Sequence, residues 1–273
     1  MEKKQQRDYK RKLLLGISLA LLIFSVVGLG FRWRDQYNNE RAVEEAREIA
    51  RESREMENSP SVYEGSLHLE DALNIPGEKP EEPRQILPFI QDLQQRNPEV
   101  VGWIELEGTE IDYPIVQAED NDYYLKRDWL GESNSAGAIF MDYRNDPEAL
   151  EERKTHTIIY GHHRQDGSMF QNLVKYKEEE YFRESPTFEV TDQYETHTYE
   201  VFSAYVTTTD FYFIETRFPE DEDFEGFLEA ITERQMYDTG VTVSAEDHLL
   251  TLSTCTYEYD DARFVVHARR VTD

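Results

Sequence analysis

The chain has 273 residues, of which 29 are Lys or Arg and 57 are Asp or Glu, so its formal net charge is −28. A body this acidic repels phosphate backbones, which argues against a nucleic-acid-binding protein. One cysteine excludes an intrachain disulfide framework and a zinc site built on cysteine pairs. The seven histidines show no HExxH or similarly close ligand spacing, so a metal enzyme is disfavoured.

The N-terminal residues have the pattern of a membrane anchor. Residues 1–12 are rich in Lys and Arg, and Leu13–Phe31 contains no charged side chain. That length crosses a bilayer as a helix, and the preceding positive charge predicts a cytoplasmic N-terminus with the body outside the cell. A cleaved signal peptide is the alternative, although the apolar run is longer than a usual signal core and no A-x-A site follows. We expect an uncleaved, single-pass anchor over residues 13–31.

Residues 32–85 lack the pattern of a packed core. Asp35–Glu57 is dense in Glu and Arg, which predicts a solvated helix or stalk. Asn58–Pro88 contains five of the ten prolines, which predicts an extended linker. We therefore expect one folded domain over residues 86–273.

The folded domain is predicted to begin with a short helix and to continue as strands. Phe89, Ile90 and Leu93 have helical spacing, and the helix should end before Pro98. An apolar period of two follows around residues 111–115. Further strands are predicted in the segments GAIFMDY, HTIIYGH, HTYEVFSAYV, HLLTLSTC and RFVVHARRV.

A second helix is predicted to interrupt the strands. In residues 218–240, Phe224, Phe227, Leu228 and Ile231 fall on one helical face. Many short strands with few helices indicate a closed or nearly closed β-barrel.

The single cysteine, Cys255, ends a predicted strand, and Arg263 begins the next one. If the two strands are antiparallel neighbours, both side chains lie at one edge of the sheet. A nucleophile then stands beside a cationic donor that can stabilise an oxyanion. Ser253 shares the face of Cys255, because side chains alternate along a strand.

The thiolate is the nucleophilic form of cysteine, so a base is needed. His162 and His163 are the best candidates, because they follow a predicted strand and Gly161, where the chain leaves a sheet edge. His267 lies inside a strand pattern and is predicted to be a structural side chain. A lone cysteine is often only a small buried residue, but the spacing of thiol, histidine and arginine together favours a catalytic site.

At these residues the sequence resembles the sortases, the cysteine transpeptidases of Gram-positive cell surfaces. TLSTC at 251–255 matches the TLxTC signature of the family, and Arg263 and His162 match its arginine and histidine. Over residues 86–273 the likeness is to class B sortases. It is carried by NPEVVGWIELEGTEIDYPIVQ, DNDYYL, GAIFMDYRND and IIYGHHRQDGSMFQNL, and by the helical segment between the predicted strands.

The resemblance implies an eight-stranded β-barrel with an N-terminal helix and a helix in the long loop between strands six and seven. It implies that Cys255 attacks the threonine carbonyl of an LPxTG-like or NPxTN-like sorting signal at the C-terminus of a secreted protein. Arg263 would stabilise the oxyanion, and His162 would protonate the leaving amine. An amine of a peptidoglycan precursor would then resolve the thioacyl enzyme. This chemistry needs no metal or organic cofactor.

Three further residues are expected to bind substrate: Ser253 from its strand face, and Asn121 and Tyr212 from their positions in the resemblance. Two other functions stay open. One is a pilin polymerase that uses a lysine of another subunit as the acceptor. The other is a membrane-tethered β-barrel that binds without catalysis.

Overall fold

The computed structural model describes residues 2–57, 84–148, 155–256, 258 and 261–271. The chain forms two compact units, Met1–Arg41 and Ala42–Asp273. The expected linker falls almost entirely on residues 58–83, outside the described residues.

Helix α1 (Glu2–Glu57) contains the predicted anchor. It is the one helix in the described part of the chain that is long and apolar enough to cross a membrane. Side chains of the apolar segment such as Leu14, Phe24 and Phe31 are exposed to the surroundings, as expected of a surface that faces lipid.

The last part of α1 differs from the expected solvated stalk. It is helical, but Ala42, Ala46 and Ala50 are buried in the second unit. The indole Nε1 of Trp129 donates a hydrogen bond to the carbonyl oxygen of Ala42 at 2.6 Å. Alanines four residues apart make a narrow stripe that lets a helix approach closely, and the surrounding Glu and Arg residues hide this stripe in the sequence.

The second helix, α2 (Pro88–Arg96), is confirmed as predicted, with Phe89, Ile90 and Leu93 buried. Proline stands in its first turn, where its missing N–H costs no hydrogen bond. Asn97 ends the helix in an extended conformation, and its amide Nδ2 donates to the carbonyl oxygen of Trp129 at 2.5 Å.

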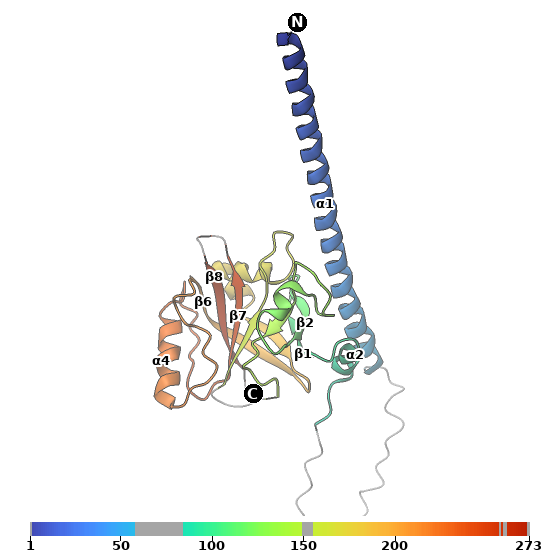
Figure 1. Cartoon of the computed structure of the whole chain (residues 1–273). Coiled ribbons are helices and arrows are strands. Elements are labelled where there is room, and N and C mark those ends of the chain that lie inside the picture. The colour runs from blue at the N-terminus through green and yellow to red at the C-terminus, as the bar shows by residue number, and fades with distance from the viewer. Residues whose placement is uncertain (1, 58–83, 149–154, 257, 259–260, 272–273) are drawn as a thin grey trace, which may run out of the picture. The chain divides into compact units, whose positions relative to one another are not determined.

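Eight strands form a closed barrel in the order β1-β2-β3-β4-β7-β8-β6-β5 (Figure 1). The strands are β1 (Val100–Glu105), β2 (Asp112–Val116), β3 (Ile139–Met141), β4 (His156–Tyr160), β5 (Thr187–Thr191), β6 (Thr196–Thr207), β7 (Leu249–Cys255) and β8 (Arg263–Arg270). The β2–β3 and β4–β7 pairs are parallel and the other pairs are antiparallel. The predicted barrel is therefore confirmed, although β1 and β5 were not among the predicted strands.

Short helices lie between the strands. They are η2 (Tyr123–Lys126), η3 (Phe170–Lys177), α3 (Glu179–Glu184) and α4 (Asp221–Thr232). Helix α4 is the predicted insertion between β6 and β7, and Phe224, Leu228 and Ile231 are buried on its inner face. It packs on the outside of the barrel beside β6 (Figure 1). The other three helices were not predicted.

Candidate active site

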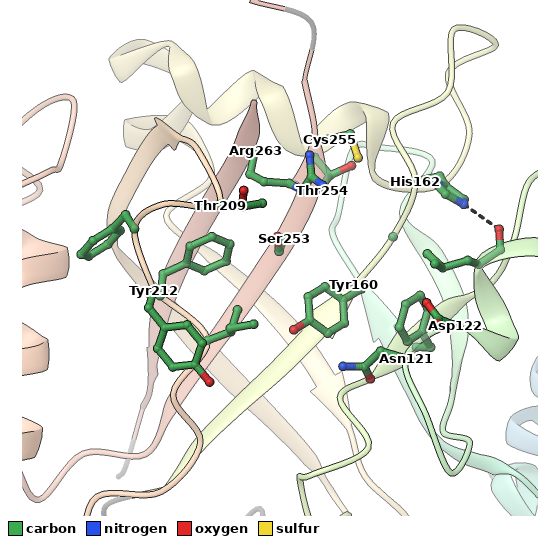
Figure 2. Close-up of a pocket in the computed structure, with 16 residues that line it drawn as sticks. Asn121, Asp122, Tyr160, His162, Thr209, Tyr212, Ser253, Thr254, Cys255 and Arg263 are labelled. Carbon is green, nitrogen blue, oxygen red and sulfur yellow. Dashed lines mark hydrogen bonds between the residues drawn. The ribbon is translucent and has the colours of Figure 1, made fainter. Parts of the chain in front are cut away.

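The β7–β8 pair brings the thiol and the guanidinium together. The two strands are antiparallel, and Cys255 and Arg263 are directly opposite each other in the register. Both side chains are half-buried. The predicted placement at one edge of the sheet is confirmed, and Figure 2 shows the Arg263 guanidinium directed toward Cys255. A cationic donor therefore lies beside the one thiol of the chain, which is the arrangement that stabilisation of an oxyanion would need.

Strand β4 brings His162 to the same edge. It runs parallel to β7, with Tyr160 opposite Ser253, and the backbone N–H of Gly161 donates to the carbonyl oxygen of Ser253 at 3.2 Å. A Cβ atom at position 161 would lie 2.5 Å from Cδ1 of Ile139 and 2.7 Å from the ring of Phe170, so any larger residue would displace these buried side chains. The chain then leaves the sheet, and His162 follows at once.

A cavity of about 340 Å³ lies at this edge (Figure 2). Its lining includes Cys255, His162 and Arg263, and also the three predicted substrate-binding residues, Ser253, Asn121 and Tyr212. Its apolar wall is made by Leu125, Phe140, Phe211, Phe213 and Ile214. The predicted catalytic and substrate-binding residues thus meet in one cavity, whereas His163, the other candidate base, is not part of its lining.

The two neighbouring histidines have different surroundings. His162 lines the cavity, and its Nε2 donates to the carbonyl oxygen of Leu125 at 2.7 Å. Figure 2 shows its ring turned toward that carbonyl and away from Cys255. The Nδ1 of His163 lies 3.0 Å from the carbonyl oxygen of Cys255, so His163 contacts the backbone of the cysteine strand. His162 therefore reaches the thiol only after its side chain rotates.

The buried carboxylate of Asp142 contacts two residues that line the cavity, Asn121 and Tyr160. Asp142 has no exposed surface, and its Oδ2 accepts hydrogen bonds from Asn121 Nδ2 at 3.0 Å and from the Tyr160 hydroxyl at 2.9 Å. Arg144 donates to both of its oxygens, Nε to Oδ1 at 2.8 Å and NH2 to Oδ2 at 2.7 Å. Burial by itself raises the pKa of Asp142, but the hydrogen bonds from Arg144, Tyr160 and Asn121 outweigh it and hold that pKa below its usual value.

Asp142 and Arg144 were not predicted as site residues, although both lie in the segment GAIFMDYRND, which carries part of the resemblance to class B sortases. No metal site is apparent in the described residues, since no three of their His, Cys, Asp and Glu side chains are grouped to hold an ion.

A half-buried thiol, a guanidinium and an imidazole around one cavity are the groups that acyl transfer through a thioester requires. The comparisons with known proteins agree. The model of the sortase domain matches residues 104–271. The chain therefore belongs to the sortase family of cysteine transpeptidases, and within it to the sortase B class.

The matches to three relatives cover from 69% to 96% of this chain. Sortase B of Listeria monocytogenes is 38% identical over 272 residues, which is 96% of this chain and 99% of the relative. A structure of sortase B from Bacillus anthracis in complex with AAEK2 is 41% identical, with a TM-score of 0.70, and covers 87% of this chain and 97% of its own. The Staphylococcus aureus sortase B–substrate complex is 35% identical, with a TM-score of 0.64, and covers 69% and 87%.

Proposed function

We propose that this transpeptidase cleaves a C-terminal sorting signal of secreted proteins after threonine and joins the new carboxyl end to an amine of a peptidoglycan precursor. The observation that carries the proposal is the direct pairing of Cys255 with Arg263 at the mouth of a mostly apolar cavity. Such a cavity suits a short peptide with an apolar residue and a reactive threonine carbonyl. The solved substrate complex of sortase B from Staphylococcus aureus supports substrate binding by a relative of this chain.

The first half-reaction begins when His162 rotates toward the thiol and accepts its proton. The Cys255 sulfur then bonds to the threonine carbonyl carbon, and the oxygen takes up negative charge that Arg263 stabilises with its N–H groups. As the oxyanion collapses, the threonine C–N bond breaks. His162 returns its proton to the leaving amine, and a thioester on Cys255 remains.

The second half-reaction reverses the steps of the first, with the acceptor amine in place of the amine that left. The nitrogen of the acceptor attacks the thioester carbonyl, and His162 accepts its proton while Arg263 again stabilises the oxyanion. The C–S bond breaks, the thiolate regains its proton, and an amide to the acceptor is released. No atom of a cofactor takes part in either half.

We infer that the enzyme works at the outer face of the cell membrane. Leu13–Phe31 holds it there as a single span, with residues 1–12 in the cytoplasm and the barrel facing the cell wall. The positive charge before the apolar run supports this orientation. Membrane fractionation with an N-terminal epitope tests it, because a shortened, soluble product that has lost the epitope would contradict an anchor.

The activity is tested with the full chain in detergent, a library of fluorescent sorting pentapeptides, and an acceptor amine of the peptidoglycan stem or cross-bridge type. We expect mass spectrometry to find an acyl adduct on Cys255 and an amide product, both absent in Cys255→Ala. An adduct that is released only by lysine side chains of pilin subunits would show polymerisation instead. A reactive thiol that forms no adduct with any peptide would contradict the proposal.

A further inference from the structure

The pair of buried Asp142 and half-buried Arg144 joins opposite walls of the cavity. This connection deepens the proposed function and rests on it. On one side the pair contacts Asn121 and Tyr160, and on the other it contacts the segment between β6 and α4 that carries Tyr212. The pair thus connects three other parts of the chain.

On the first wall, Asp142 fixes the orientation of Asn121. The amide Nδ2 of Asn121 donates to Asp142 Oδ2 at 3.0 Å, while its Oδ1 accepts the backbone N–H of Tyr143 at 3.1 Å. A reversed amide would lose both bonds, so the orientation is determined. The amide keeps one N–H that is not used in these bonds, and Figure 2 places Asn121 and Tyr160 on the same side of the cavity.

On the second wall, Arg144 holds a segment without regular secondary structure, residues 208–217. Its NH1 donates to the hydroxyl of Tyr212 at 2.9 Å, and its NH2 donates to the carbonyl oxygen of Ile214 at 2.9 Å. Tyr212 is 53% exposed, so burial alone does little to fix its position. Arg144 therefore supplies a directional restraint on the wall opposite Asn121.

We propose that Asp142 and Arg144 are positioning residues that set the distance between Asn121 and the Tyr212–Ile214 wall, and so determine how tightly the sorting peptide binds between them. A planar, forked guanidinium satisfies carboxylate, hydroxyl and carbonyl acceptors at once, which lysine cannot do. The reacting atoms belong to Cys255, His162 and Arg263, which the pair does not contact. Its loss should therefore weaken binding more than it slows chemistry.

The test measures thioester formation by the full chain in detergent against the concentration of a pentapeptide that the wild type accepts. For Arg144→Lys, we expect the peptide dissociation constant to rise about tenfold, because the forked donor is lost. The acylation rate at saturating peptide should change by less than about threefold. Tyr212→Phe removes only the hydroxyl of an exposed side chain, and should raise the dissociation constant about threefold.

Arg269→Lys is the matched control. Arg269 makes a comparable forked contact with Glu200, by Nε at 3.1 Å and NH2 at 2.7 Å, on strands β8 and β6 and outside the cavity lining. Wild-type binding by Arg144→Lys, or an equal loss in Arg269→Lys, would overturn the proposal. So would an equal fall in the saturating rate and in the binding of Arg144→Lys.

A second measurement separates this proposal from the proposed function. If the wild type forms no adduct with any sorting peptide, the proposed function fails, and hydrogen exchange still tests the restraint. Arg144→Lys should speed exchange of backbone amides in residues 208–217 by about tenfold relative to the wild type and to Arg269→Lys. Unchanged exchange in that segment would overturn the positioning role.

Discussion

Gly137 lies directly against the ring of His162. Its φ is +66°, and a Cβ atom there would be 2.8 Å from Cδ2 of His162 and 2.8 Å from the carbonyl oxygen of Tyr124. A methyl group would push the imidazole from its place or hold it there without room to rotate. The proposed mechanism requires His162 to turn toward Cys255. The free space next to Gly137 is therefore expected to affect the rate of thioester formation.

We expect Gly137→Ala to slow thioester formation by at least about tenfold, because the histidine is displaced. Alkylation of Cys255 by iodoacetamide should report whether the thiol itself remains accessible. Gly108→Ala is the control, since Gly108 has a similar φ of +73° but no atom within 4 Å of the position that a Cβ would take. Both substitutions place a side chain at a positive φ and should destabilise the backbone to a similar degree. An equal loss of the acylation rate in both variants would therefore refute a specific effect on His162.

Arg263 gives a second test at this scale. Lysine keeps the positive charge but cannot place two parallel N–H donors, so we expect Arg263→Lys to lower the acylation rate by at least about 100-fold. Single-turnover acylation measures the effect. Turnover close to that of the wild type would reject the oxyanion role.

The choice between the two histidines is tested separately. His162 lines the cavity and His163 contacts the backbone of Cys255, so His162→Ala should abolish transfer while His163→Ala keeps most of it. The same steady-state transfer assay compares the two variants. Loss of transfer in both would leave the proposed base without support.

Part of the site was predictable from the sequence because it follows strand geometry. Cys255 ends strand β7 and Arg263 begins strand β8. Because these strands are antiparallel neighbours, the short loop between the two residues places them opposite each other. Asp142 and Arg144 could not be found this way, because their partners lie 18 to 70 residues away in the chain. Only the closed barrel brings those partners together.

At the scale of strands, four buried side chains form one directed hydrogen-bond chain across β4, β7, β8 and β6. Nδ1 of His156 contacts the carbonyl oxygen of Glu215 at 2.5 Å and must donate, so its Nε2 accepts from the hydroxyl of Thr251 at 2.5 Å. That oxygen accepts from Nδ1 of His267 at 2.6 Å, whose Nε2 accepts from Tyr205 at 2.7 Å. Every bond is satisfied when both histidines are neutral.

Protonation of His156 or His267 would place an N–H on a nitrogen that now accepts a hydrogen bond from a hydroxyl group. Two donors would then face each other, and that hydrogen bond would be lost. Burial lowers the pKa of His156 to about 4 and the pKa of His267 well below its usual value. It also lowers the pKa of His248, a buried histidine outside this hydrogen-bond chain, to about 3. The unfolded chain binds these protons below about pH 6.5, whereas the folded chain does not until about pH 4. Stability from these groups is therefore fully present above pH 6.5 and is lost as the pH falls from there toward 4.

We expect the free energy of unfolding to fall by about 1.4 kcal/mol per pH unit for each of these three histidines between about pH 6 and 4.5. Urea unfolding of the detergent-solubilised chain at about 0.5 M salt measures this while screening the acidic surface. His248→Gln removes one titrating group and should reduce the slope by about one third. A free energy of unfolding that is constant over this range would contradict the prediction.

The strand pattern explains which elements were predictable. Strands β4, β6, β7 and β8 have long β-branched or aromatic runs, and all four were predicted. Strand β1 is buried along nearly all its length and follows a helix directly, so it shows no alternation of apolar and polar residues to separate it from α2. Strand β5 has only two large apolar residues, Phe188 and Val190, and it follows the acidic helix α3 closely, so its alternation is too short to separate it from its surroundings.

At the scale of the whole molecule, the boundary at which the charge changes sign differs from the boundary at which the packed unit begins. Residues 1–34 carry a net charge of +6 and the remainder −34, so the charge changes sign just after the apolar segment. The compact unit that holds the barrel begins at Ala42, well before the predicted domain start at residue 86. Composition locates the apolar segment, but it does not reveal that residues 42–57 pack as part of the second unit.

These residues contribute more than their alanines. The guanidinium of Arg47 donates through Nε to the carbonyl oxygen of Asp112 at 3.0 Å and through NH2 to that of Glu110 at 3.0 Å. Without residues 42–57, the indole N–H of Trp129 loses its acceptor on Ala42. The buried cluster that includes Phe89 and Trp129 would then be exposed on one side.

We therefore expect a fragment of residues 42–273 to melt at least about 5 °C above a fragment of residues 58–273, because the shorter one loses both apolar burial and hydrogen bonds. Calorimetry compares the two. Within the longer fragment, Ala46→Lys should lower the melting temperature by a similar amount, since Ala46 has no exposed surface, whereas Glu48→Lys at an exposed position should change it little. Equal melting temperatures for the two fragments would mean that this helical segment is a stalk after all, and that the barrel is complete without it.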